Sequence, residues 1–131
     1  MKKDIENRTD IDNLMNRFYA IAMTDETIGY VFEIAELDLE HHLPIIGDFW
    51  ETLLFSSGDY QKHGRNPLQV HADLNEKTPL FLEHFERWLE IFRETVDESF
   101  AGERADFIKI RANAIANRMF SYIGDIPVGM H

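Results

Sequence analysis

The stretch Asn66-Pro67-Leu68-Gln69-Val70-His71-Ala72-Asp73-Leu74 carries most of the information about the fold of this chain. It predicts a short helix, because Asn66 can accept a bond from the first-turn amides and Pro67 suits the first helical position. His71 falls on the inward side of that helix, together with the leucines of the stretch. A neutral imidazole held there suits a transition metal, and the alternative is a core histidine bonded within the protein. His71 is therefore the first candidate ligand.

Composition bounds the class of protein. The chain has 131 residues, enough for one domain with a real core, and 44% of them are hydrophobic. Its 24 acidic residues against 13 basic ones give a net charge of −11, which repels nucleic acids and anionic membranes. Cysteine is absent, which excludes disulfides, thiolate metal sites and a cysteine nucleophile.

The two ends of the chain are polar or irregular. The first residues turn polar at once, without an apolar signal region, and no apolar run reaches membrane-spanning length. We therefore expect a soluble cytoplasmic protein with no nucleic-acid or membrane partner. Residues 1–131 should form a single domain, with loose tails at 1–8 and 124–131.

Apolar residues recur at helical spacing along the chain, which predicts an all-α fold without strands. The expected helices span residues 9–23, 40–55, 66–74, 79–100 and 103–123, with a brief element between 25 and 35. Thr9 and Thr78 are the expected caps of the first and fourth of these helices, and Phe81 is expected on the buried face of the fourth. The second should begin near His41, because Pro44 is tolerated only in a first turn.

Several chemistries are excluded by spacing. No histidine follows a glutamate by three residues, as ferritin-like di-iron helices require, and the His-Glu-x-x-His pattern and phosphate-binding glycine loops are missing. No serine sits in a nucleophile elbow. The adjacent His41 and His42 point to two faces of a helix, so they make a poor bidentate metal site.

Three polar-tipped rings and two imidazoles fall on inward or flanking positions of four predicted helices, and two phenylalanines accompany them. Any one of them has an ordinary explanation as core packing. Together they are unusual, because each buried N–H or O–H demands a partner, and a large flat apolar ligand with a polar centre would use them all. The set is Tyr19, Phe32, His42, Phe49, Trp50, His71 and Trp88.

Five stretches in this order and spacing resemble the group III truncated haemoglobins, over nearly the whole chain. They are Phe18-Tyr19, Gly29-Tyr30-Val31-Phe32, His42-Leu43-Pro44-Ile45-Ile46-Gly47-Asp48-Phe49-Trp50, Asn66-Pro67-Leu68-Gln69-Val70-His71 and Phe85-Glu86-Arg87-Trp88-Leu89. The combination is specific, although no single piece is. The resemblance implies a shortened two-over-two globin fold around haem b. Pro44, just after His42, departs from the family's pattern and bears on where that helix starts.

The resemblance also implies roles for particular residues. His71 would be the proximal iron ligand, and Tyr19, His42 and Trp88 would lie on the distal side. Lys62, His63 and Arg65 are cations near the expected haem propionates. The remaining residues expected to contact the haem are Phe32, Ile45, Ile46, Phe49, Trp50, Pro67, Leu68 and Phe81.

A polar distal side of this kind implies ligand chemistry rather than oxygen transport. Hydrogen bonds from Tyr19 and Trp88 to a partly negative ligand, each worth about 1.5–3 kcal/mol, would slow dioxygen release roughly 10²–10⁴-fold. That favours nitric oxide dioxygenation, peroxide reduction or redox sensing, with dioxygen, nitric oxide or other diatomic molecules as ligands and an unidentified reductase as partner. His42 is expected to gate the pocket, the alternative being a sixth iron ligand. The rival class is a non-enzymatic helical interaction module without haem.

Overall fold

The computed structural model describes residues 2–55 and 80–124, with side chains as far as Phe120. These ranges form helices and short connections and contain no strand, so the predicted all-α class is confirmed. No helix within them has the length and apolar content needed to cross a membrane. The predicted 66–74 helix lies outside the described residues, as do Thr78 and Pro79. The described helices are α1 (Arg8–Ala22), α2 (Gly29–Ile34), α3 (Leu39–Phe55), α5 (Leu82–Ser99) and α6 (Glu103–Gly124).

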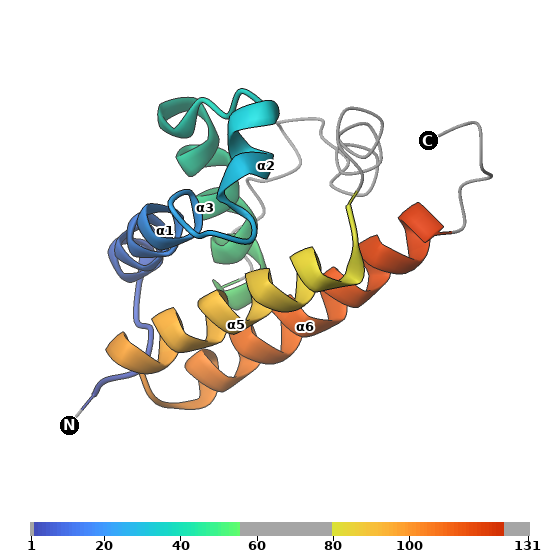
Figure 1. The fold of residues 1–131 in the computed structure, drawn as a ribbon. Coiled ribbons are helices and arrows are strands. Elements are labelled where there is room, and N and C mark those ends of the chain that lie inside the picture. The colour runs from blue at the N-terminus through green and yellow to red at the C-terminus, as the bar shows by residue number, and fades with distance from the viewer. Residues whose placement is uncertain (1, 56–79, 125–131) are drawn as a thin grey trace.

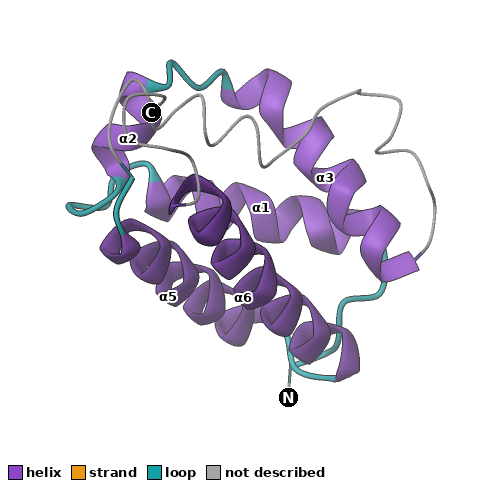
Figure 2. Cartoon of the chain, turned by 90° about the vertical axis from the view of Figure 1, so that its right-hand side faces the viewer, coloured by secondary structure: helices purple, strands orange, loops and turns teal. Residues whose placement is uncertain are grey.

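The four long helices pack as two layers. Helix α1 packs against α3, and α5 packs against α6; α1 also contacts α5, and α3 contacts α6. Figure 1 shows α5 and α6 running side by side below α1 and α3, and Figure 2 shows the same pairs from the side. The short helix α2 lies near the end of α1. The core lies between the layers, and Phe18 and Phe92 are almost fully buried in it.

Helix α1 presents the apolar stripe that its sequence predicts. Its predicted inward residues are all buried, whereas its start differs from the expectation. The Oδ1 atom of Asn7 accepts the Asp10 N–H at 3.0 Å, so Asn7 is the N-cap instead of Thr9. The predicted and observed inward residues are Ile11, Leu14, Met15, Phe18 and Ala22.

The segment before α1 is held against the start of α6, so the expectation of a loose tail is wrong for the residues described there. Ile5 is fully buried. The carboxylate of Asp4 accepts the backbone N–H groups of Arg104 and Ala105, both at 2.9 Å, and thereby caps α6. Gly102 has φ of +145°, and a Cβ there would lie 2.5 Å from the Asp4 carboxyl carbon. Glycine at this position thus lets the cap approach.

Helix α3 begins at Leu39, close to the expected start, but Pro44 lies in its interior, so the expectation that this proline occupies the first turn is wrong. Asp38 explains the earlier start, because its carbonyl accepts the His42 N–H at 2.9 Å. Its carboxylate also accepts the His41 N–H at 3.4 Å. A proline beyond the first turn removes one helical N–H, and α3 continues through it to Phe55.

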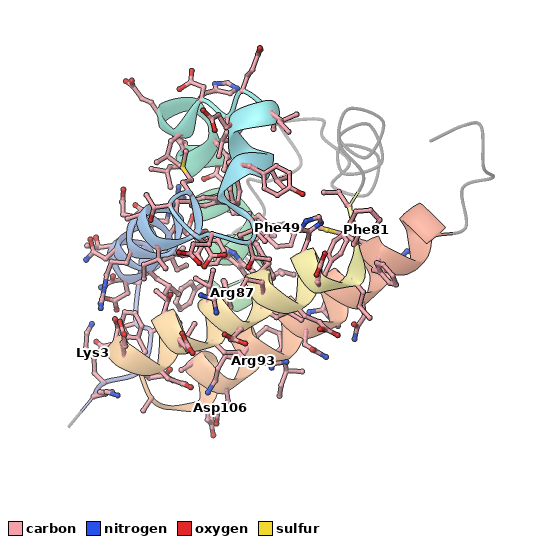
Figure 3. The ribbon with its side chains drawn as sticks, in the orientation of Figure 1. Lys3, Phe49, Phe81, Arg87, Arg93 and Asp106 are labelled. Carbon is pink, nitrogen blue, oxygen red and sulfur yellow. The ribbon has the colours of Figure 1, made fainter. Side chains whose placement is uncertain are left out.

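Helix α5 begins at Leu82, later than predicted, and Phe81 is 55% exposed instead of lying on the buried face. The reason is a cap that the sequence pattern did not reveal. The Nδ1 atom of His84 accepts the Phe81 N–H at 2.9 Å, and the His84 N–H donates to the Phe81 carbonyl at 3.0 Å. Phe81 is extended at this cap, and Figure 3 shows it at the start of α5.

Candidate functional site: an aromatic cavity with a polar wall

A cavity of about 330 Å³ lies between the two helical layers. All five described helices contribute to its lining. Most of the predicted site residues within the described ranges meet there, although Phe81 is not among the lining residues. His71 and the other predicted contacts Arg65, Pro67 and Leu68 lie outside the described residues, so their roles stay predictions. The predicted residues that line the cavity are Tyr19, Phe32, His42, Ile45, Ile46, Phe49, Trp50 and Trp88.

Tyr19 and His42 form the polar contact of this cavity. Tyr19 comes from α1 and is 6% exposed, and its phenol oxygen lies 2.7 Å from Nε2 of His42 on α3. The two rings meet edge to face, with centroids 5.2 Å apart. Burial raises the pKa of the Tyr19 phenol above its ordinary value, so the group stays protonated at neutral pH and can donate. The buried hydroxyl therefore has the partner that it requires.

The direction of the Tyr19–His42 bond depends on where the imidazole carries its proton. If Nε2 is bare, it accepts the phenol hydrogen; if Nε2 is protonated, it donates to the phenol oxygen. In the second state the Tyr19 hydrogen is free to point at a ligand in the cavity. His42 can thus decide whether Tyr19 is available as a donor.

Trp88 brings a second donor to the cavity from α5. Its indole ring stacks on Phe92, with centroids 5.3 Å apart and planes inclined by 15°, and it meets the edge of Phe18 at 5.5 Å. No acceptor for its indole N–H occurs among residues 2–55 and 80–120. The ring is half-buried, and it lines the same cavity as Tyr19. A ligand in the cavity could therefore receive this N–H.

The rest of the wall is apolar. Phe32 on α2 meets Tyr19 edge to face with ring centroids 6.0 Å apart, and Phe49 on α3 meets Trp50 in the same way with centroids 5.1 Å apart. Aliphatic side chains complete the lining, among them Ile45 and Ile46. Such a wall would bury a flat apolar ring system, while Tyr19, His42 and Trp88 confine its polar interactions to part of the surface.

Sequence reasoning missed His84, which is 8% exposed and also lines the cavity. Its Nδ1 accepts the Phe81 N–H, so a neutral ring carries its proton on Nε2. Nε2 lies 2.8 Å from the hydroxyl of Tyr30 on α2 and donates to it. The four-residue spacing between His84 and Trp88 was a usable signal, because it places both side chains on one face of a helix.

A second polar link connects α5 to the start of α2. The Nε and Nη2 atoms of Arg87 both donate to Oδ1 of Asp25, at 3.0 and 2.8 Å. The other oxygen of Asp25 accepts the N–H groups of Thr27 and Ile28, just before α2. The bonds from Arg87 are the main reason that the pKa of Asp25 lies below its ordinary value. These links fix the helix that carries Phe32 against α5.

Comparison with known proteins places this arrangement in a family. No protein-family model matches the chain. It is 33% identical over 132 residues to the group 3 truncated haemoglobin ctb of Campylobacter jejuni, a match that covers 95% of this chain and 99% of that protein. The crystal structure of the group III truncated haemoglobin from Campylobacter jejuni matches with a TM-score of 0.80 at 32% identity, over 94% of this chain and 95% of that one. The chain therefore belongs to the group III truncated haemoglobins and has their truncated globin fold.

Proposed function

We propose that this protein binds haem b in the cavity between its two helical layers and takes up dioxygen, nitric oxide or another diatomic ligand beside Tyr19 and Trp88. The donor chemistry of the cavity fits this group. Its apolar wall, built around Phe32 and Phe49, suits a porphyrin face, and its polar side chains gather from α1, α3 and α5. Bound haem would supply the iron at which the diatomic ligand is held.

His71 remains the proposed proximal ligand to that iron. The proposal rests on its sequence context and on membership of the family, because neutral imidazole is the axial ligand of globins. The propionates are proposed to meet the cations Lys62, His63 and Arg65, which precede it in the sequence.

The observation that carries the functional proposal is the pair of donors on an otherwise largely apolar wall. Tyr19 is buried and held protonated, and the Trp88 N–H has no acceptor among the described side chains. A ligand that gains negative charge on binding would accept from both groups, and water would not compete well inside the cavity. Two such bonds, at about 1.5–3 kcal/mol each, slow release roughly 10²–10⁴-fold.

Slow release argues for chemistry on the ligand and against transport. The proposed role is nitric oxide or peroxide detoxification, in which Tyr19 and Trp88 orient the ligand and His42 controls access and the proton on Tyr19. Turnover would need electrons from a reductase. The net charge of −11 is compatible with a basic partner of that kind.

Ligand release rates test this proposal directly. Dioxygen and carbon monoxide dissociation would be measured in the haem-loaded wild type, Tyr19→Phe, Trp88→Phe and the double variant. Each single variant should release dioxygen at least about tenfold faster, with a smaller change for carbon monoxide, which is a poorer acceptor. The effects should not simply add, because both donors reach one ligand. Equal dioxygen release in all four proteins would overturn the proposed distal side.

A further inference from the structure

We propose that Phe92, backed by Trp50, is a positioning residue that fixes the direction of the Trp88 indole N–H in the cavity. The inference rests on the proposed function, because it concerns how one of the two proposed donors is aimed. It gives a specific role to Phe92 and Trp50, which would otherwise be regarded as ordinary residues of the hydrophobic core.

Trp88 depends on ring contacts for its orientation. Its N–H has no acceptor among residues 2–55 and 80–120, so no hydrogen bond from that part of the chain holds the indole in place. The nearly parallel ring of Phe92, inclined by 15° with centroids 5.3 Å apart, covers one part of the indole. The edge-on ring of Phe18 is inclined by 76° and limits rotation in another direction. Offset-parallel and edge-to-face contacts are the directional ones for aromatic rings.

Phe92 is itself held by Trp50. It is 1% exposed, and its centroid lies 5.6 Å from that of Trp50, with the planes inclined by 31°. Trp50 is 2% exposed and comes from α3, while Phe92 and Trp88 come from α5, one helical turn apart. Phe92 thus links the Trp50 ring to the Trp88 ring across the two layers.

Phe18 sets the relation between the two proposed donors. Its ring meets three others edge to face. The ring centroids are 5.1 Å apart for Tyr19, 5.5 Å for Trp88 and 5.5 Å for Phe92. Phe18 therefore contacts the rings of both proposed donors, and it also contacts the Phe92 ring on which the Trp88 indole stacks. Phe92 contacts the indole directly and is linked to Tyr19 through Phe18, so a change at Phe92 should affect Trp88 more than Tyr19.

The test replaces Phe92 with leucine, which keeps an apolar side chain and removes the stacking surface. Phe100→Leu is the matched control, because Phe100 is buried at 7% exposure at the end of α5, away from this ring group. Trp50→Leu and Trp50→Phe form a second pair, in which phenylalanine retains a ring against Phe92. This pair also serves if Phe92→Leu does not fold.

The first readout is the indole N–H signal of Trp88 in nitrogen-15 NMR spectra of the full chain without added haem, assigned with Trp88→Phe. Phe92→Leu and Trp50→Leu should shift or broaden that signal, because the ring current and the orientation both change. In Trp50→Phe the Trp88 signal should lie close to its wild-type position, unlike in Trp50→Leu. Phe100→Leu should leave the Trp88 signal in place. An unchanged Trp88 signal in Phe92→Leu would overturn the proposal. This arm stands even if the protein binds no haem, so the two failures are distinguishable.

The second readout is dioxygen release from the haem-loaded protein. Phe92→Leu should speed release by several-fold to about tenfold, a part of the factor expected when the Trp88 bond is lost outright. In a Trp88→Phe background the same substitution should have little further effect, because a positioning residue acts through the group that it positions. An equal acceleration in both backgrounds would contradict the assignment, since Phe92 would then act independently of Trp88.

Discussion

The phenol oxygen of Tyr19 lies 2.7 Å from Nε2 of His42, which joins α1 to α3 across the cavity. His42 is half-buried in this position and forms part of the wall. It stands four residues into α3, just before Pro44, where the helical turn has fewer internal hydrogen bonds than a helix interior. We therefore propose that the bond to Tyr19 acts as a closure that an incoming ligand must open.

The first prediction concerns this closure. His42→Leu should change the association rates of carbon monoxide and dioxygen, and we expect an increase, because leucine cannot bond to Tyr19. Flash photolysis measures these rates. His41→Leu is the matched control, since His41 is the exposed neighbour on another face of α3.

The same variant separates a gate from an iron ligand. If His42 acts only as a gate, His42→Leu should leave the resting ferric and ferrous absorption spectra unchanged. A low-spin bis-imidazole spectrum in the resting wild type that disappears in His42→Leu would show that His42 binds the iron instead.

The second prediction concerns the bond between His84 and Tyr30. Tyr30→Phe should lower the free energy of unfolding by about 0.5–1.5 kcal/mol, because it leaves the Nε2–H of a buried imidazole without its acceptor. Urea unfolding of Tyr30→Phe, His84→Leu and the double variant measures the coupling. Simple additivity of the two losses would show that the bond contributes nothing to stability.

The third prediction concerns pH and the Asp25–Arg87 pair. The pKa of Asp25 is lowered in the folded protein from its ordinary 3.8, chiefly by the bonds from Arg87. The contribution of Asp25 is therefore fully present above the unfolded pKa and is lost as the pH falls through the folded pKa. Asp25→Asn should destabilise the protein by about 1–2 kcal/mol at neutral pH, because it removes the negative charge to which Arg87 donates. The loss should be no larger, because Arg87 is one-third exposed and solvent screens the pair.

This loss should shrink as the pH falls below about 4, because the Asp25 carboxylate is protonated first in the unfolded chain and, at still lower pH, in the folded protein. Thermal or urea unfolding across this pH range checks the sign. Asp97→Asn is the control, because the side chain of Asp97 is 59% exposed and pairs only at the surface. A destabilisation by Asp25→Asn that grows on acidification would refute the account of this pair.

The fourth prediction concerns the start of α6. Asp4→Ala should cost about 0.5–2 kcal/mol of stability, because the carboxylate caps two backbone N–H groups of that helix. Asp106→Ala, in the first turn of the same helix with a 72% exposed side chain, should cost much less. Equal losses in the two variants, measured by urea unfolding, would show that charge near the helix start matters and the specific cap does not.

The sequence predicted those parts of the fold that depend on periodic burial. The apolar stripe of α1 follows helical spacing, and its five inward residues are all buried, because both layers pack against that one face. The cavity-lining positions of Tyr19, His42 and Trp88 were foreseen for a related reason. Each of them flanks or continues an apolar stripe, so it lies where the layers meet.

The errors fall where one specific hydrogen bond, local in one case and long-range in the other, overrides the periodic pattern. The start of α5 depends on the His84 imidazole accepting the Phe81 N–H, and helix-start rules based on Thr78 and Pro79 do not consider a histidine in that role. Residues 2–7 look like a polar tail until the cap from Asp4 onto Arg104 is known. That contact joins positions 100 residues apart, which no window of sequence contains.

Haem titration of the purified chain, followed by absorption spectroscopy, tests most directly whether this protein binds haem. We expect binding of one haem per chain, with a Soret band whose ferrous form shifts on addition of carbon monoxide. We also expect that His71→Ala loses the haem or shows a changed spectrum that added imidazole restores. A wild-type protein that stays colourless after haem addition would contradict the account and favour a haem-free helical interaction module. Wild-type spectra retained in His71→Ala would remove His71 as the proximal ligand.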